Sequence, residues 1–522
     1  MARVLVTEEI APGGLDRLRE AGHEVIERLA PSPDELLELV AGVEALIIRS
    51  ATKVTDAVLE AGSNLVVVGR AGIGLDNVDV EAATTRGVMV VNAPQSNILS
   101  AAEHTMALLL AQARNVPQAH AALKAGRWER SRWEGVELAD KVLGIVGLGR
   151  IGKLVAQRAH AFGMRLIAYD PFVAPERARQ MSVELVDLER LMAQADFVTL
   201  HLAKTKETMG LIGADLLAKA KPGIRIINVA RGGIIDEAAL ADAITSGRVG
   251  GAALDVFAEE PTTESPLFAL DEVVVTPHLG ASTREAQDKA GDTIADMVLL
   301  ALAGDFVPFA VNVSAAEASE TVRPFLALAE RLGRLYASLN GGLPPVLEVE
   351  YQGQIADYDT RILTLSVLKG AFGTTTDQPV SYVNAPQIAA DQGIDVQASA
   401  TSSPGEYVNL VTVRGGEHAI AGTLAGPSGS PRITMIDDLS VDLPPARSML
   451  VVRNTDVPGM IATVASALAE AAINIDDMHL GHSQEGAAAM QVLATTPAVP
   501  DDVQATLRSV DGILDVHVLA DE

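Results

Sequence analysis

The stretch VLGIVGLGRIGKLVAQRAHAFGMRLIAYD, residues 142–170, constrains the fold of this chain more than any other segment. A short apolar run predicts a buried strand, a GxGxxG pattern follows it, and an amphipathic helix and a second strand come next. In that context Gly147 permits a tight turn, Gly149 lets backbone amides approach a pyrophosphate, and Gly152 lets the helix pack closely on its strand. The free N–H groups at the helix start would face the phosphates. A dinucleotide-binding domain is therefore favoured over a glycine turn without a ligand.

Asp170 closes the second strand of this unit. A carboxylate at that position would accept hydrogen bonds from the hydroxyl groups of an adenosine ribose, and it would repel a 2′-phosphate. The sequence therefore predicts NAD rather than NADP as the cofactor.

Strand and helix patterns alternate on both sides of the glycine motif. Residues 1–96 contain short β-type runs separated by amphipathic helices, which predicts a separate α/β lobe. From residue 143 to about 279 the alternation predicts a doubly wound, mostly parallel sheet. A long helical stretch over 282–304 could return the chain to the first lobe. The nucleotide domain is thus expected to be inserted within another domain, and the lobe before it would form the far wall of a cleft.

The net charge and the composition restrict the possible binding partners and the cellular location. The chain of 522 residues carries a formal net charge of −28, which disfavours nucleic acid and anionic membranes as main partners. Cysteine is absent, so disulfides and thiolate metal sites are excluded, and no metal is expected. Without a signal-peptide pattern or a membrane-length apolar run, the expected location is the cytoplasm. A small anionic ligand would need a locally basic cleft, which directs attention to individual arginines.

Three polar side chains stand beside predicted strand ends of the nucleotide domain: Arg231, Glu260 and His278. A guanidinium can grip a carboxylate with two parallel hydrogen bonds, and an imidazole titrates near neutral pH and suits proton transfer. A neighbouring carboxylate would orient the imidazole and favour its protonated form. Taken singly, each residue is better explained structurally: Arg231 as a surface residue, Glu260 as a loop acid and His278 as a satisfied polar residue. Together in one α/β domain they predict hydride transfer to or from a hydroxy acid.

The segments GLGRIG, RGGIIDE, LDVFAEEP and PHLGAST resemble those of the D-isomer-specific 2-hydroxyacid dehydrogenases, in the same order and at similar intervals. The resemblance over residues 1–310 implies a Rossmann NAD domain inserted in a flavodoxin-like substrate domain. It implies Arg231 as substrate clamp, His278 as acid and base, and Glu260 as the partner of His278. The cofactor contacts that it implies are Gly147, Gly149, Arg150, Ile151, Gly152, Asp170, Leu202, Val229, Ala230, Asp255, Gly280 and Ala281.

Basic and glycine residues gather at strand ends of the N-terminal lobe. Within the family, this lobe and the extra C-terminal half are most similar to long bacterial members that oxidise 3-phosphoglycerate to 3-phosphooxypyruvate at the start of serine synthesis. The substrate contacts that the similarity implies are Arg49, Arg70, Gly72, Ile73 and Asn97. For the two glycines of GIGLDN, a plain turn between strands explains the sequence nearly as well, and the basic stretch GRWERSRWEG reads as a solvated loop.

The last segment, from residue 448 onward, reads as strand–helix–strand–strand–helix–strand, which predicts a ferredoxin-like fold. It resembles an ACT domain, which implies a small-molecule regulatory site. Asn454, Asp456 and Asn474 are the candidate contacts for L-serine as effector, although a purely structural pairing domain is a real alternative. Paired ACT domains and the family suggest a homotetramer.

The predicted fold class is α/β, with an intervening α+β domain between the dehydrogenase part and the ACT domain. Residues 315–445 are rich in Ser, Thr, Gly and Pro and carry no chemical motif. The expected division is 1–96 with 285–312 for the substrate, 97–284 for NAD, 313–446 for the intervening domain and 447–522 for the ACT domain. The alternatives are a hydroxypyruvate or glyoxylate reductase and, in another class, an NAD-sensing binding protein.

Overall fold

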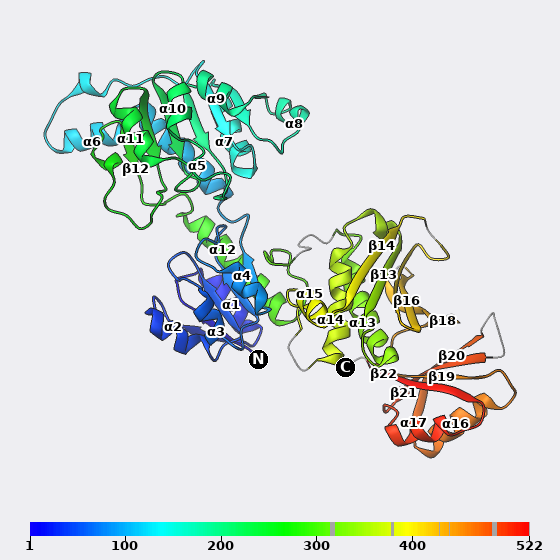
Figure 1. Ribbon diagram of the computed structural model, residues 1–522. Helices are drawn as coiled ribbons and strands as arrows, with labels where there is room; N and C mark the ends of the chain where they lie inside the picture. Colours follow the sequence, from blue (N-terminus) through cyan, green and yellow to red (C-terminus); the bar gives the residue numbers. More distant parts are fainter. Residues whose placement is uncertain are drawn as a thin grey trace.

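The computed structural model describes residues 1–313, 319–376, 380–403, 405–426, 428–437, 439–482 and 488–520. Within these residues the strands form four sheets, which follow one another along the chain except where the nucleotide-binding unit interrupts the first lobe (Figure 1). The predicted α/β class is confirmed.

The N-terminal lobe is a parallel sheet with strand order β2-β1-β3-β4-β5, the flavodoxin-like order expected from the family resemblance. Its Val- and Ile-rich strands are buried because helices cover both faces, α1 and α12 on one side and α2, α3 and α4 on the other. The elements are β1 (Arg3–Val6), α1 (Pro12–Glu20), β2 (Glu24–Glu27), α2 (Pro33–Val40), β3 (Ala45–Ile48), α3 (Asp56–Ala61), β4 (Val67–Arg70), α4 (Val80–Thr85), β5 (Met89–Asn92) and, after the insertion, α12 (Arg284–Leu302).

The inserted unit is a second parallel sheet, with order β12-β11-β10-β9-β6-β7-β8. This is the doubly wound Rossmann order with one further strand. Helices α5 and α7 pack on one face, and α9, α10 and α11 pack on the other. The elements are α5 (Ile98–Ala113), α6 (Val116–Lys124), η1 (Arg130–Trp133), β6 (Val142–Val146), α7 (Arg150–Ala161), β7 (Arg165–Tyr169), α8 (Pro175–Arg179), β8 (Val183–Leu185), α9 (Leu188–Gln194), β9 (Phe197–Leu200), α10 (Ala214–Lys219), β10 (Ile224–Asn228), α11 (Glu237–Thr245), β11 (Val249–Leu254), η2 (Pro266–Ala269) and β12 (Val273–Val275).

The segment with weak sequence periodicity folds into a mixed sheet of order β14-β13-β15-β16-β17-β18. The strands of this sheet share no single burial pattern: β14 leaves almost every side chain in solvent, β13 alternates strictly, and β16 is buried along its centre. The elements are η3 (Arg323–Phe325), α13 (Leu326–Asn340), β13 (Val346–Gly353), η4 (Gln354–Asp357), α14 (Arg361–Thr375), α15 (Ala385–Asp391), β14 (Asp395–Thr401), β15 (Asn409–Gly415), β16 (His418–Ala425), β17 (Ser430–Ile436) and β18 (Leu439–Leu443).

The C-terminal unit is the expected antiparallel βαββαβ fold, with sheet order β20-β21-β19-β22. Helices α16 and α17 cover one face of this sheet, around a small core of Leu and Val side chains. The elements are β19 (Ser448–Thr455), α16 (Met460–Glu470), β20 (Asn474–His482), β21 (Ala488–Thr496), α17 (Asp501–Arg508) and β22 (Ile513–Ala520).

The buried clusters show which units are packed into one another. One apolar cluster is continuous from β1 and α12 of the first lobe through α13 and α14 to β19 and β21. The clusters of the nucleotide-binding unit are separate from it. Figure 1 also shows the nucleotide-binding unit set apart from the rest of the chain, with α5 and α12 near its junction with the first lobe. Among the described residues, no helix combines the length and apolarity needed to cross a membrane.

Candidate active site

The glycine motif adopts the conformation that a phosphate-binding turn requires. Gly147 follows β6 with a φ of +95°, and a side chain there would lie 2.5 Å from the carbonyl oxygen of His201. At Gly152 a Cβ atom would lie 2.2 Å from the carbonyl oxygen of Gly147, so only glycine lets α7 pack this closely. Beside Gly149, the residue before α7, no heavy atom lies within 4 Å of a built Cβ position. The open space at this helix N-terminus fits the pyrophosphate of NAD.

Asp170 lies directly after β7, beside the glycine turn. Its carboxylate accepts hydrogen bonds from the backbone N–H groups of Leu148, at 2.8 Å, and Phe172, at 2.9 Å. These two bonds leave further lone pairs on a side chain that is half-buried. The carboxylate is therefore fixed next to the turn and can still accept hydrogen bonds from ribose hydroxyls.

We expect Asp170→Ala to weaken NAD binding about tenfold or more and NADP binding much less. Each lost hydrogen bond to a charged acceptor contributes about 1.5–3 kcal/mol for NAD, whereas a 2′-phosphate gains from removal of the negative charge. Damage to the glycine turn would weaken both cofactors alike, so the ratio of the two KM values is the informative readout. An unchanged ratio would refute the role of Asp170, and Asp215→Ala, at an exposed aspartate of α10, is the matched control.

The candidate catalytic residues follow three neighbouring strands. Arg231 comes after β10, Glu260 after β11 and His278 after β12, and these strands are adjacent in the sheet. The carboxyl ends of parallel strands share one edge, where ligands bind in open α/β sheets. Other predicted cofactor contacts lie at the same edge: Leu202 follows β9, Val229 and Ala230 follow β10, Asp255 follows β11, and Gly280 and Ala281 follow β12.

His278 and Glu260 form a close polar pair in the site. The Nδ1 atom of His278 lies 2.6 Å from Oε2 of Glu260, and the other oxygen of Glu260 accepts the N–H of Phe257 at 2.8 Å. Burial raises the pKa of Glu260, but the hydrogen bonds from His278 and Phe257 outweigh it and hold this pKa below its usual value. The carboxylate therefore stays charged, and Nε2 is the ring nitrogen left to meet a substrate.

The β12–α12 loop, residues 276–283, is organised around the buried side chain of Asp255. Its Oδ1 accepts the N–H of Leu279 at 2.7 Å and the hydroxyl of Thr276 at 2.5 Å, and its Oδ2 accepts the N–H of Gly280 at 2.8 Å. Nε2 of His104, on α5, lies 3.2 Å from Oδ1. Although burial raises the pKa of Asp255, these hydrogen bonds hold it below the usual value. Oδ2 has the remaining capacity to accept a hydrogen bond from a cofactor amide.

Arg231 reaches from the nucleotide-binding unit to the N-terminal lobe. Its Nε lies 3.4 Å from Oδ2 of Asp76, and a Cβ atom on Gly74 would lie 2.5 Å from its Nη2. On its own side, the carbonyl of Arg231 accepts a hydrogen bond from the amide of the buried Asn228 at 2.9 Å. The guanidinium thus lies against the loop after β4 and can grip a ligand placed between both units.

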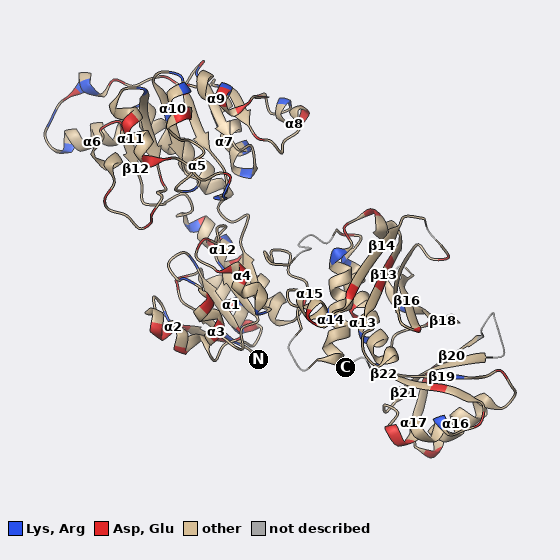
Figure 2. Cartoon of the chain, in the orientation of Figure 1, with Lys and Arg blue, Asp and Glu red and all other residues tan. Residues whose placement is uncertain are grey.

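The predicted substrate contacts stand at the ends of adjacent strands of the first lobe. Arg49 follows β3, Arg70 ends β4, Gly72 and Ile73 lie in the next loop, and Asn97 follows β5. Burial, together with repulsion from nearby Arg231 and Arg49, lowers the pKa of Arg70 to about 10, so it remains a cation at neutral pH. The side-chain oxygen of Asn97 is buried without a hydrogen-bond partner. Three guanidinium groups thus gather where both units meet. Elsewhere the chain is acidic, and Figure 2 shows Asp and Glu positions in red on helices such as α2 and α17.

The predicted effector residues do not converge within one chain. Asn454 is opposite Ala489 at one end of β21, and Asn474 is opposite Thr496 at the other end. Seven residues of strand separate them, which corresponds to about 23 Å. The side chain of Asn454 is also buried, donating to the carbonyl of Thr455 and accepting from Gln491. Asp456 and Asn474 are exposed.

The structure adds residues that the sequence interpretation missed: His104 and Asn228, which hold loops of the site, Asp76 beside Arg231, and Glu8. The carboxylate of Glu8 accepts the N–H groups of Arg49, Ala51 and Thr52 and so fixes the loop after β3. Neither acidic residue gives a signal in the sequence, because its partners lie far along the chain: backbone N–H groups for Glu8 and the Arg231 side chain for Asp76.

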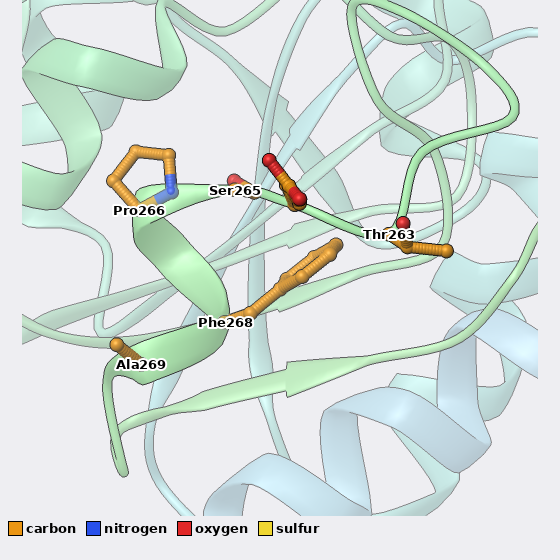
Figure 3. A pocket seen from close by; sticks show the side chains of 6 residues that line it. Thr263, Ser265, Pro266, Phe268 and Ala269 are labelled. Atoms are coloured by element: carbon orange, nitrogen blue, oxygen red, sulfur yellow. The ribbon is translucent and has the colours of Figure 1, made fainter.

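An open hollow of about 640 Å³ lies on the segment between Glu260 and β12 (Figure 3). Its lining comes from one stretch, residues 263–269, with the ring of Phe268 packed edge-on against Phe257 at 5.3 Å between ring centres. It contains neither Arg231 nor His278, so we place the candidate site at the strand ends instead.

Family models match three parts of the chain. Residues 106–280 match the D-isomer specific 2-hydroxyacid dehydrogenase NAD binding domain, residues 321–437 the D-3-phosphoglycerate dehydrogenase intervening domain, and residues 448–512 the ACT domain. Among solved structures, the TT0316 protein of Thermus thermophilus is 36% identical, with a TM-score of 0.56 over 59% of this chain and 99% of that one. A glyoxylate reductase from Paecilomyes thermophila is 29% identical, with a TM-score of 0.54 over 58% and 95%.

The fold and the site together define an NAD-dependent dehydrogenase of the D-isomer-specific 2-hydroxyacid class. A D-3-phosphoglycerate dehydrogenase of Mycobacterium tuberculosis is 48% identical over 97% of both chains, and one of Synechocystis is 42% identical over 99% of this chain and 95% of its own. The chain belongs to the D-3-phosphoglycerate dehydrogenase family.

Proposed function

We propose that this protein oxidises 3-phospho-D-glycerate to 3-phosphooxypyruvate, the first step of L-serine biosynthesis, in the cytoplasm. The observation that carries the proposal is the gathering of Arg49, Arg70 and Arg231 in a chain of net charge −28. The His278–Glu260 pair follows the strands next to the one that Arg231 follows. A substrate with both a carboxylate and a phosphate needs more than one cationic partner. Full-length relatives that are named for this activity support the assignment.

Each residue of the site has a separate role in the proposed reaction. Bound NAD would supply the acceptor for the hydride that leaves C2 of the substrate. Arg231 binds the carboxylate and polarises the C2 oxygen, and Arg49 and Arg70 offer contacts for the phosphate. Neutral His278 removes the hydroxyl proton through Nε2, and Glu260 stabilises the resulting imidazolium because its charge lies against Nδ1.

The substrate comparison tests this proposal. We expect kcat/KM for 3-phosphoglycerate to exceed that for D-glycerate and D-lactate by about 100-fold or more, because these analogues leave the phosphate contacts unused. The readout is NADH formation in steady state with each acid. If 3-phosphoglycerate is no better a substrate than D-lactate or D-glycerate, the assignment is wrong.

We further propose feedback inhibition by L-serine at paired ACT domains. Asn454 and Asp456 lie near one end of β21, and Asn474 lies at the other end. One small amino acid can therefore contact both groups only if two chains contribute. This geometry supports an assembly of more than one chain, and the family suggests a homotetramer. In this arrangement Asp456 faces the ammonium group of serine and Asn474 its carboxylate.

We expect Asn474→Ala to abolish inhibition by serine while leaving kcat for 3-phosphoglycerate unchanged, because the residue is remote from the strand ends of the dehydrogenase site. The measurement is the initial rate across a serine titration. Thr506→Ala is the control. This exposed hydroxyl of α17 donates to the carbonyl of Asp502 in the same helix, so the variant should keep the inhibition. Inhibition retained in Asn474→Ala would count against this effector site.

A further inference from the structure

Helix α5 touches the β12–α12 loop at two points. Nε2 of His104 lies 3.2 Å from Oδ1 of Asp255 and 3.2 Å from Oγ1 of Thr276. Four residues earlier, Oγ of Ser100 lies 2.7 Å from Oγ1 of Thr283. Residues four apart lie on the same face of a helix, so one stripe of α5 follows this loop from its first residue to its last.

The contact at His104 closes a compact hydrogen-bonded triangle. The hydroxyl of Thr276 donates to Oδ1 of Asp255 at 2.5 Å, so the Thr276 oxygen retains lone pairs for a donor. The carboxylate oxygen of Asp255 cannot donate, and the hydroxyl hydrogen of Thr276 is already used. The Nε2 atom of His104 must therefore carry the hydrogen that bonds to both oxygens. The ring of His104 is mostly buried and Asp255 is fully buried, which strengthens these bonds.

The same carboxylate fixes the backbone on which His278 sits. The N–H groups of Leu279 and Gly280 bond to Asp255, and His278 itself has the left-handed φ of +56°, which a non-glycine residue adopts only when its surroundings impose it. Any tilt of Asp255 is therefore transmitted to the peptide groups directly after the imidazole.

We propose that His104 is a positioning residue for the reaction, which acts through Asp255 and Thr276 to hold the β12–α12 loop so that His278 meets the substrate hydroxyl. The proposal rests on the role proposed for His278. In this role His104 contacts neither substrate nor cofactor. It lies on α5, the helix that leads out of the first lobe, and fixes the loop that carries His278.

The test compares His104→Phe, which keeps a ring of similar size without a donor, with His104→Gln, whose amide can donate to the same oxygens. We expect His104→Phe to lower kcat for 3-phosphoglycerate about tenfold or more, with the KM values for substrate and NAD within about threefold of the original enzyme. His104→Gln should recover most of this loss. Thr105→Val is the control, because its buried hydroxyl donates to the carbonyl of Ala101 within α5 and not to the loop.

Two further arms keep the test decisive. In a double-mutant cycle, Thr276→Val and His104→Phe should be clearly non-additive in kcat, because both remove parts of one network. His278→Asn, measured alongside, separates the hypotheses: if it stays active, the proposed site fails whatever His104 does. If His278→Asn is inactive, any of three results overturns the positioning role. The first is a kcat of His104→Phe within twofold of the original enzyme, and the second is a His104→Gln variant no more active than His104→Phe. The third such result is additive effects of Thr276→Val and His104→Phe on kcat.

Discussion

Replacing His278 by Asn is expected to lower kcat for 3-phosphoglycerate oxidation about 1,000-fold. Asn can hydrogen-bond to the substrate hydroxyl but cannot take its proton, and general-base catalysis contributes about 10²–10⁴-fold to such reactions. The hydrogen bond to Glu260 holds the ring by Nδ1, so the lost group is the one that faces the substrate. The KM for 3-phosphoglycerate should change little, because carboxylate and phosphate binding rest on the arginines.

The matched control for this variant is His160→Asn, an exposed histidine of α7 in the same unit. It should retain the original kcat. Binding of NADH, followed by fluorescence titration, should be the same in both variants within about twofold. A His278→Asn enzyme that kept more than a tenth of the original kcat would show that another group accepts the proton.

Replacing Arg231 by Gln is expected to lower kcat/KM for 3-phosphoglycerate about 100-fold or more. The loss of a bidentate, charge-assisted pair with a carboxylate removes about 3 kcal/mol, and each 1.4 kcal/mol corresponds to a factor of ten. The variant also removes the cation that lies 3.4 Å from Asp76, so the negative charge of this carboxylate is less compensated near the substrate anion. Arg231→Lys restores the charge without the planar fork and should recover only part of the activity.

Steady-state kinetics with varied 3-phosphoglycerate measure this effect, and KM should rise together with the fall in kcat/KM. Arg190→Lys, at an arginine of α9 paired with Glu184 on the surface, is the control and should behave as the original enzyme. If Arg231→Gln kept kcat/KM within fivefold, the substrate carboxylate would have to bind elsewhere.

The parts of the site that the sequence predicted are those carried by local patterns. The GxGxxG turn between β6 and α7 depends on neighbouring residues, and the geometry at Gly147 and Gly152 follows the expected roles. The Rossmann and flavodoxin-like sheets were predictable because parallel strands buried on both faces read as continuous apolar runs. The insertion of one unit in the other followed from the long helix after β12.

The missed parts depend on contacts between residues far apart in the chain. Asp76 of the first lobe lies next to Arg231 of the nucleotide-binding unit, and His104 on α5 contacts Asp255 in the loop after β11. Nothing in either local sequence marks such a pair. The effector residues looked like one set because their motifs are close in sequence, but strand register places Asn454 and Asn474 at opposite ends of β21. Register is a tertiary property that composition and periodicity do not reveal.

The continuous apolar cluster suggests how a distant effector could act on the site. It joins the first lobe, α13, α14 and the ACT sheet, whereas the nucleotide-binding unit has cores of its own. A ligand that shifts the ACT sheet would therefore act through the lobe that carries Arg49 and Arg70, because the nucleotide-binding unit shares no core with that sheet.

The most direct test of this account is a crystal structure of the protein with NADH and 3-phosphoglycerate bound. We predict that Nε2 of His278 lies within hydrogen-bonding distance of the C2 oxygen, with the substrate carboxylate on the guanidinium of Arg231 and the nicotinamide beside C2. A substrate bound outside the junction of the first lobe and the nucleotide-binding unit, or a C2 oxygen out of reach of His278, would contradict it.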